Sequence, residues 1–130
     1  MATLTPTLTL TSTDATSDEL SFSVTDTLTV KEPSVGLSKV SATTTCGDNI
    51  ILASHSSIRY LFLRHTGVNA AGSTVTTTLE VEIENGKSFA ELSAGEWLFV
   101  PVGQNGGSVA VQLEASGGDI IAEYAFWTKG

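Results

Sequence analysis

Residues 74–92 read TVTTTLEVEIENGKSFAEL, and this stretch decides the fold class. In its first half, apolar residues occupy odd-numbered positions and glutamates even-numbered ones. The apolar residues are Val75, Leu79, Val81 and Ile83, and the glutamates are Glu80, Glu82 and Glu84. Successive side chains of a strand point to opposite faces, so this period of two predicts a strand with one face on a core and one in water. We therefore expect residues 74–84 to form a strand.

A tight turn is predicted at Asn85-Gly86, because both residues tolerate the positive φ of a type I′ hairpin. The register that follows pairs residues on the two sides of the turn: Glu84 with Lys87, Ile83 with Ser88, Val81 with Ala90 and Leu79 with Leu92. It also sets Glu80 opposite Glu91. Like charges directly opposite destabilise a ladder, so the pairing is expected to end before that point.

The same alternation recurs along most of the chain, with turn signals about every 8–12 residues. From Leu20 to Val30 it is broken only by Asp26, which indicates a bulge or a turn between two short strands, and a turn is expected at Lys31–Gly36. About eight or nine strands without a helical period predict an all-β, single-domain, antiparallel β-sandwich. A jelly-roll-like arrangement is preferred, although strand spacing does not separate it from an immunoglobulin-like sandwich.

Composition points the same way. The 130 residues include 19 Thr and 15 Ser, and 15% are charged. Threonine is β-branched and fits a pleated, half-hydrated surface, whereas helix surfaces usually carry Glu, Lys and Arg. Long helices are therefore not expected, and the length suits one domain with its own core.

The charge of the chain and its lack of targeting signals limit the classes of binding partner that are expected. Six basic residues against 14 acidic ones give a formal charge of −8, which opposes binding to nucleic acid or to an anionic membrane. The single cysteine, Cys46, excludes a disulfide within the chain. The first residues lack the charged and apolar regions of a signal peptide, and no apolar run approaches ~18 residues. A soluble product without a cleaved leader is expected.

The N-terminal segment predicts an extended arm. Residues 3–11 read TLTPTLTLT, a strand pattern in which Pro6 lacks the N–H that a central strand needs. Residues 12–18 are polar and predict a loop. We expect an arm and loop over residues 1–18 and a β-sandwich domain over residues 19–130. The arm either pairs with a neighbouring subunit or forms an edge strand of its own sheet.

Two segments are apolar on both parities, residues 60–63 (YLFL) and 120–127 (IIAEYAFW). One sandwich of this size has no second core to cover both faces of such strands. A neighbouring subunit would cover them, and a homotrimer is expected. The residues expected at interfaces between subunits are Leu4, Leu8, Leu10, Tyr60, Phe62, Trp97 and Trp127.

Residues that could carry chemistry do not form a motif. His55 and His65 supply too few ligands for a zinc site, and no nucleophile elbow surrounds any serine. Cys46 is interpreted as an inert thiol rather than a nucleophile. Glu80, Glu82 and Glu84 could bind Ca²⁺ if other oxygens converged, but a solvated strand face is the preferred interpretation. No catalytic residue, metal ligand or cofactor is expected.

The glycine-rich segments and the aromatic residues also favour structural roles over binding sites. Residues 103–107 (GQNGG) and 116–118 (SGG) are glycine-rich but precede no helix, which favours hairpin turns over a phosphate loop. The aromatic residues could stack on sugars, as in a carbohydrate-binding module. Because they lie within strands, packing in a core or between subunits is preferred.

Four blocks share their order and spacing with one family: residues 12–30 (STDATSDELSFSVTDTLTV, then PSVG at 33–36), 60–67 (YLFLRHTG), 89–101 (FAELSAGEWLFVP) and 123–129 (EYAFWTK). They resemble small virion structural proteins of tailed phages, particularly contractile-tailed phages of cyanobacteria. The resemblance covers most of the chain. Ser93-Ala94-Gly95 departs from the Pro-Gly of the family's block, so the geometry of this turn stays open.

The resemblance implies a non-enzymatic building block of the virion, assembled in the host cytoplasm, without cofactors. The expected function is a capsid decoration protein that stabilises the particle by packing across capsomer junctions. Its expected partners are further copies of itself and the major capsid protein or another virion protein. The alternatives are a neck or tail component and, in a different class, a carbohydrate-binding β-sandwich module.

Overall fold

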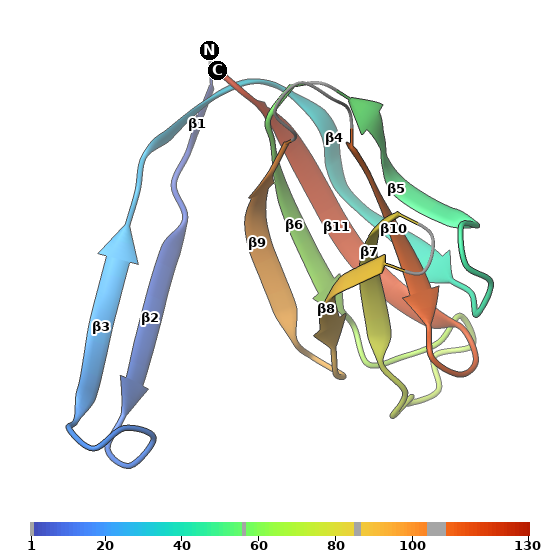
Figure 1. Cartoon of the computed structure of the whole chain (residues 1–130), viewed down its shortest axis with the longest axis horizontal. Coiled ribbons are helices and arrows are strands. Elements are labelled where there is room, and N and C mark those ends of the chain that lie inside the picture. The colour runs from blue at the N-terminus through green and yellow to red at the C-terminus, as the bar shows by residue number, and fades with distance from the viewer. Residues whose placement is uncertain (1, 56, 85–86, 104–108) are drawn as a thin grey trace.

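The computed structural model of this chain (Figure 1) describes residues 2–55, 57–84, 87–103 and 109–130. Within these ranges there is no helix, and all paired strands are antiparallel, which confirms the all-β class. No helix of the described residues could cross a membrane. The described residues form eleven strands, where eight or nine were expected: β1 (Ala2–Leu4), β2 (Thr7–Ser12), β3 (Leu20–Thr25), β4 (Leu28–Ala42), β5 (Asn49–His55), β6 (Arg59–His65), β7 (Leu79–Glu84), β8 (Lys87–Leu92), β9 (Trp97–Val102), β10 (Val109–Ala115) and β11 (Ile120–Lys129).

The strands form two large sheets and a separate hairpin. The five-stranded sheet has the order β1-β4-β11-β6-β9, the four-stranded sheet the order β5-β10-β7-β8, and β2 pairs with β3 alone. The eight strands from β4 to β11 pair in a nested way: β4 with β11, β5 with β10, β6 with β9 and β7 with β8. Each pair encloses the next along the sequence, and successive pairs alternate between the two sheets.

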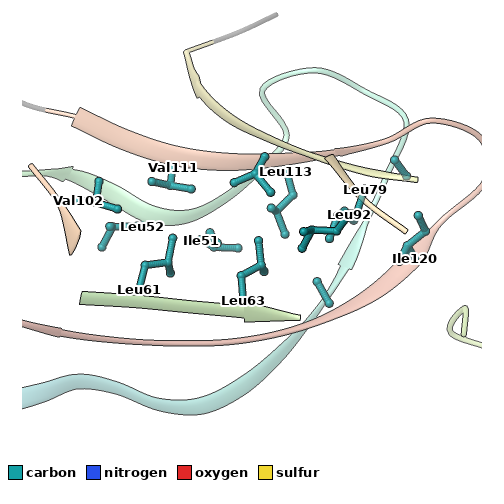
Figure 2. Packing of buried hydrophobic residues seen from close by; sticks show 14 residues of the cluster. Ile51, Leu52, Leu61, Leu63, Leu79, Leu92, Val102, Val111, Leu113 and Ile120 are labelled. Atoms are coloured by element: carbon teal, nitrogen blue, oxygen red, sulfur yellow. The ribbon is translucent and has the colours of Figure 1, made fainter. Parts of the chain in front are cut away.

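A hydrophobic core lies between the two sheets (Figure 2). Leu61 and Leu63 on β6 are fully buried from one side, as are Val111 and Leu113 on β10 from the other. At roughly 25 cal/mol per Å² of apolar area, burial of such side chains is the dominant favourable contribution to folding. The cluster comprises Ala42, Ile51, Leu52, Leu61, Leu63, Leu79, Val81, Leu92, Val102, Val111, Leu113, Ala115, Ile120 and Ala122.

The hairpin predicted around Asn85-Gly86 is present, although those two residues lie outside the described ranges. Pairing of Glu84 with Lys87, Val81 with Ala90 and Leu79 with Leu92 is confirmed. Two predictions are wrong. Ser88 pairs with Glu82 rather than Ile83, because irregularities in the register flank Glu82. The ladder also continues through Glu80 and Glu91.

The alternation predicted for residues 74–84 holds only in part. Leu79 and Val81 are fully buried as expected, but Ile83 is 41% exposed and Glu82 is fully buried. The registry with β10 places Glu82 opposite Gln112, on the face away from the core residues Val81 and Leu113. The side chain of Glu82 is therefore buried by other segments of the chain that cover the outer face of the sheet, and not by the core.

The N-terminal segment divides at Pro6. Before it, β1 is an edge strand that pairs in the same chain with β4, Thr3 opposite Thr29. After it, β2 and β3 form a hairpin that projects away from the two sheets (Figure 1). Residues 3–11 therefore form two strands rather than one continuous arm, and their pairing with another subunit stays a prediction. The hairpin contains residues on both sides of the expected boundary between residues 18 and 19.

The segment after the hairpin is one long strand. Asp26 lies between β3 and β4, as one of its two interpretations required. The turn expected at Lys31–Gly36 is wrong, because β4 runs through these residues and pairs with β11. The register shifts between β4 and β11 fall in this region, so the proline and glycine are accommodated as irregularities of the ladder.

Candidate interaction surface

An aromatic band lies on the outer face of the five-stranded sheet. Leu61 and Leu63 of β6 face the core, so Tyr60, Phe62 and Arg64 face outward. Their ladder partners share this face, and the regular register gives three rows across β11, β6 and β9: Trp127, Tyr60 and Pro101; Ala125, Phe62 and Phe99; Glu123, Arg64 and Trp97. Five aromatic rings therefore occupy one continuous outward surface.

Exposure differs strongly within this band. Tyr60 is only 7% exposed and stacks on Phe99, with ring centroids 6.1 Å apart and an interplanar angle of 11°. Trp97, at the sheet edge, is 52% exposed. A tryptophan half in water on an edge strand offers a large contact area that the chain itself leaves uncovered.

The projecting hairpin has one apolar and one hydroxyl face. Cross-strand pairs Leu8–Val24 and Leu10–Phe22 form the apolar face, and each of these four side chains is between 38% and 47% exposed. On the opposite face Thr7 and Thr25 hydroxyl oxygens lie 2.9 Å apart and those of Thr9 and Ser23 3.1 Å apart. The hydroxyl groups of one face form hydrogen bonds with each other, whereas the apolar side chains of the other face have no core to pack against.

The base of the hairpin and the edge of the sheet enclose a groove of about 240 Å³. One wall carries Leu8 and Val24, and the other carries Trp97 and Phe99. Pro6, Thr7 and Asp26 complete the lining. Two apolar surfaces that are distant in sequence thus face each other across an open space.

The seven residues expected at interfaces lie in three settings. Leu8 and Leu10 are exposed on the hairpin, and Trp97 is exposed on β9. Phe62 and Trp127 are half-buried in the aromatic band, Tyr60 is buried there, and Leu4 is half-buried on β1. The groove brings Leu8 and Trp97 together, while Leu4 lies apart from both in the β1–β4 ladder. Sequence analysis missed Phe22 and Val24, whose strand alternation was visible but whose separation from the core was not.

His65 has a structural setting. It is fully buried, its Nδ1 accepts the Gly67 backbone N–H at 2.9 Å, and its Nε2 lies 2.9 Å from the Thr77 carbonyl oxygen. Because a backbone N–H can only donate, Nδ1 is the acceptor and Nε2 donates to Thr77. Both ring nitrogens therefore form hydrogen bonds with loop 66–78, and these bonds hold the loop on β6. The side chain of His55 lies outside the described residues.

The glutamates considered as a cation site differ in burial. Glu80 is half-buried and Glu82 fully buried, while the side chain of Glu84 lies outside the described residues. Glu82 is grouped instead with Cys46 and Glu114, whose ligand atoms lie within 4.8 Å of one another. The Cys46 Sγ is 3.5 Å from the Glu82 Oε2. Sequence spacing could not reveal this group, because its members come from a loop and two strands.

The turn left open by the sequence is a type II β-turn. The Glu96 N–H donates to the Ser93 carbonyl at 3.0 Å, and Gly95 has φ 86° while Ala94 has a negative φ. The Gly95 N–H also donates to the His65 carbonyl at 2.9 Å, which fixes the start of β9 beside the end of β6. Of the glycine-rich segment 103–107, all but Gly103 lies outside the described residues.

In the comparisons with known proteins, no family model, no curated protein and no solved structure matches this chain.

Proposed function

We propose that this chain is a virion structural protein of a tailed phage, most specifically a capsid decoration protein that stabilises the particle by packing across capsomer junctions. The four sequence blocks support the family. The observation that carries the assembly role is the projecting β2–β3 hairpin, whose apolar face holds Leu8, Leu10, Phe22 and Val24 half exposed. An isolated two-stranded hairpin is at best marginally stable in water, so this face is suited to packing on another surface.

A jelly-roll-like β-sandwich is part of the proposal. It is supported by the nested pairing of β4 to β11, which is the pattern obtained when one long antiparallel ribbon is rolled into two sheets. Such a fold offers two broad sheet faces and projecting loops, and needs no active site to serve as a building block. No enzymatic activity is proposed.

Self-association to a homotrimer is proposed on the aromatic band together with the hairpin. Exposed apolar area beyond what scattered surface residues provide marks interaction sites. The band accounts for the two-sided apolar strands noted in the sequence, since Phe62, Trp97 and Trp127 face away from the core. The major capsid protein or another virion protein is the proposed second partner.

Purified particles provide the test. Mass spectrometry should find the chain in stoichiometric amount, and antibody labelling in electron micrographs should place it over the capsid shell. Copy number separates the sites, because a decoration protein repeats across the capsid shell and a neck or tail component is present in far fewer copies. Its absence from washed particles would end the proposal.

A carbohydrate-binding module is the second candidate, favoured by one observation. Trp97 is 52% exposed beside a groove that also holds Asp26, and a flat indole next to a carboxylate is a common way to hold a sugar ring. Saturable binding to a glycan array that Trp97→Ala abolishes would support it. Trp127→Ala, in the same band but outside the groove, is the matched control for loss of aromatic surface.

A further inference from the structure

We propose that the β2–β3 hairpin of one copy packs its apolar face on the aromatic band of a second copy, with the acidic hairpin tip against Arg64 and Lys39. This inference rests on the proposed function, because it names the contact through which the building block would assemble. It commits to a second copy of this chain as the occupant of the band.

The hairpin extends too far to be covered by its own sheet. Only its base, at Leu8 and Val24, shares the groove with Trp97 and Phe99. Further toward the tip, Leu10 is 46% and Phe22 47% exposed, and the hairpin leads away from the sheets (Figure 1). The outer half of the apolar face therefore needs a surface from another molecule.

Charge is distributed in a complementary way. Residues 1–30 contain no lysine or arginine, and the hairpin tip carries Asp14, Asp18 and Glu19, all exposed. On the outer face of the five-stranded sheet, Lys39, Glu123 and Arg64 are ladder neighbours in one row across β4, β11 and β6. Even with Glu123 between them, this row is a locally positive strip on a chain of net charge −8.

The order of the two surfaces also matches. Along the hairpin the pairs Leu8–Val24 and Leu10–Phe22 precede the acidic tip. Along β6 the Tyr60 and Phe62 rows precede the Arg64 row, with ~7 Å between successive rows. A hairpin laid along β6 can thus place apolar pairs on aromatic rows and carboxylates near Arg64 in a single orientation.

The contact joins two different surfaces of the same chain. Such a heterologous contact repeats from copy to copy and closes into a ring when the rotation between copies allows it. A closed ring of three copies covers every hairpin and every band, as does a reciprocal two-fold exchange of hairpins between two copies. The proposed trimer is the ring form of this contact.

Cross-linking between differently labelled copies tests the contact. On a Cys46→Ser background, purified Leu10→Cys chains are mixed with Phe62→Cys chains under mild oxidation, and intact mass identifies the products. A disulfide joining one chain of each kind is expected. Thr9→Cys, on the hydroxyl face of the same hairpin, is the matched control and should link much less. Equal linking by both, or none by Leu10→Cys, overturns the proposal.

A charge exchange gives a second readout that does not depend on the aromatic side chains. Arg64→Glu should weaken self-association by about threefold per contact, as for a partly exposed ion pair. The double variant Arg64→Glu/Asp18→Lys should restore association, because every hairpin-to-band contact then again pairs opposite charges. A chain that is found on particles but is monomeric in sedimentation at micromolar concentration would overturn the contact between hairpin and band. The proposed function would stay intact. Absence from particles despite the expected disulfide between copies would overturn the proposed function while leaving the contact intact.

Discussion

Glu80 on β7 and Glu91 on β8 lie directly opposite each other in the ladder, and each carboxylate accepts a hydrogen bond from a nearby hydroxyl. The Ser88 Oγ donates to the Glu80 Oε2 at 2.8 Å, and the Thr78 Oγ1 donates to the Glu91 Oε1 at 2.7 Å. A pair that should end the ladder is therefore tolerated, because each negative charge has its own donor.

Removal of these donors should expose the repulsion. We expect Thr78→Val and Ser88→Ala each to lower the free energy of unfolding by about 1 kcal/mol. On a Glu91→Gln background the cost of Thr78→Val should shrink, since the amide carries no charge to stabilise. Urea denaturation of the four proteins measures the coupling, and Thr76→Val serves as the matched control. Equal costs in both backgrounds would show that the hydroxyl does not act through the charge.

The type II turn at Ser93–Glu96 predicts opposite effects at adjacent residues. Ala94→Pro should stabilise by about 0.4–1 kcal/mol, because proline favours the first central position of this turn and restricts the unfolded chain. Gly95→Ala should destabilise by about 1–2 kcal/mol, because a side chain resists φ 86°. Thermal melts of both variants check the pair. A loss of stability in Ala94→Pro would contradict the turn assignment.

His65 should matter for stability. His65→Leu leaves the Gly67 N–H and the Thr77 carbonyl without partners in a buried site, at a cost of about 2 kcal/mol or more. His65→Gln, which retains one acceptor and one donor, is expected to cost less. Chemical denaturation compares the two variants, and equal losses would indicate that ring volume rather than hydrogen bonding is important.

Excision of the hairpin should separate assembly from folding. Pro6 and Asp26 are joined by a backbone hydrogen bond of 3.1 Å, so residues 7–25 can be replaced by two glycines. We expect the free energy of unfolding of the remaining chain to change by no more than about 1 kcal/mol, because these strands contribute nothing to the core cluster. We also expect this chain to lose self-association. Sedimentation and calorimetry measure the two properties.

Deletion of residues 2–4 is the contrasting variant. These residues form β1, which pairs with β4 inside the chain, so their removal should lower the melting temperature of the subunit itself. If the shorter chain instead melts unchanged while the hairpin excision unfolds it, the division at Pro6 is not the boundary between folding and assembly.

The features that depend on neighbours along the chain could be predicted from the sequence. Alternation with a period of two places β7, β10 and β11 as strands, and Asn85-Gly86 sets most of the β7–β8 register, because strand faces and tight turns are decided within a few residues. The antiparallel all-β class follows from the same signals.

The contacts between distant segments could be seen only in the folded chain. Nothing local shows that Pro6 divides an edge strand from a hairpin, that Glu82 is covered beside Cys46 and Glu114, or that His65 bonds Thr77. Leu8 and Leu10 alternate with polar residues as the core residues Leu79 and Val81 do, yet one pair is exposed and the other buried. Alternation states that a strand has an apolar face, and burial of that face depends on contacts between residues far apart in sequence.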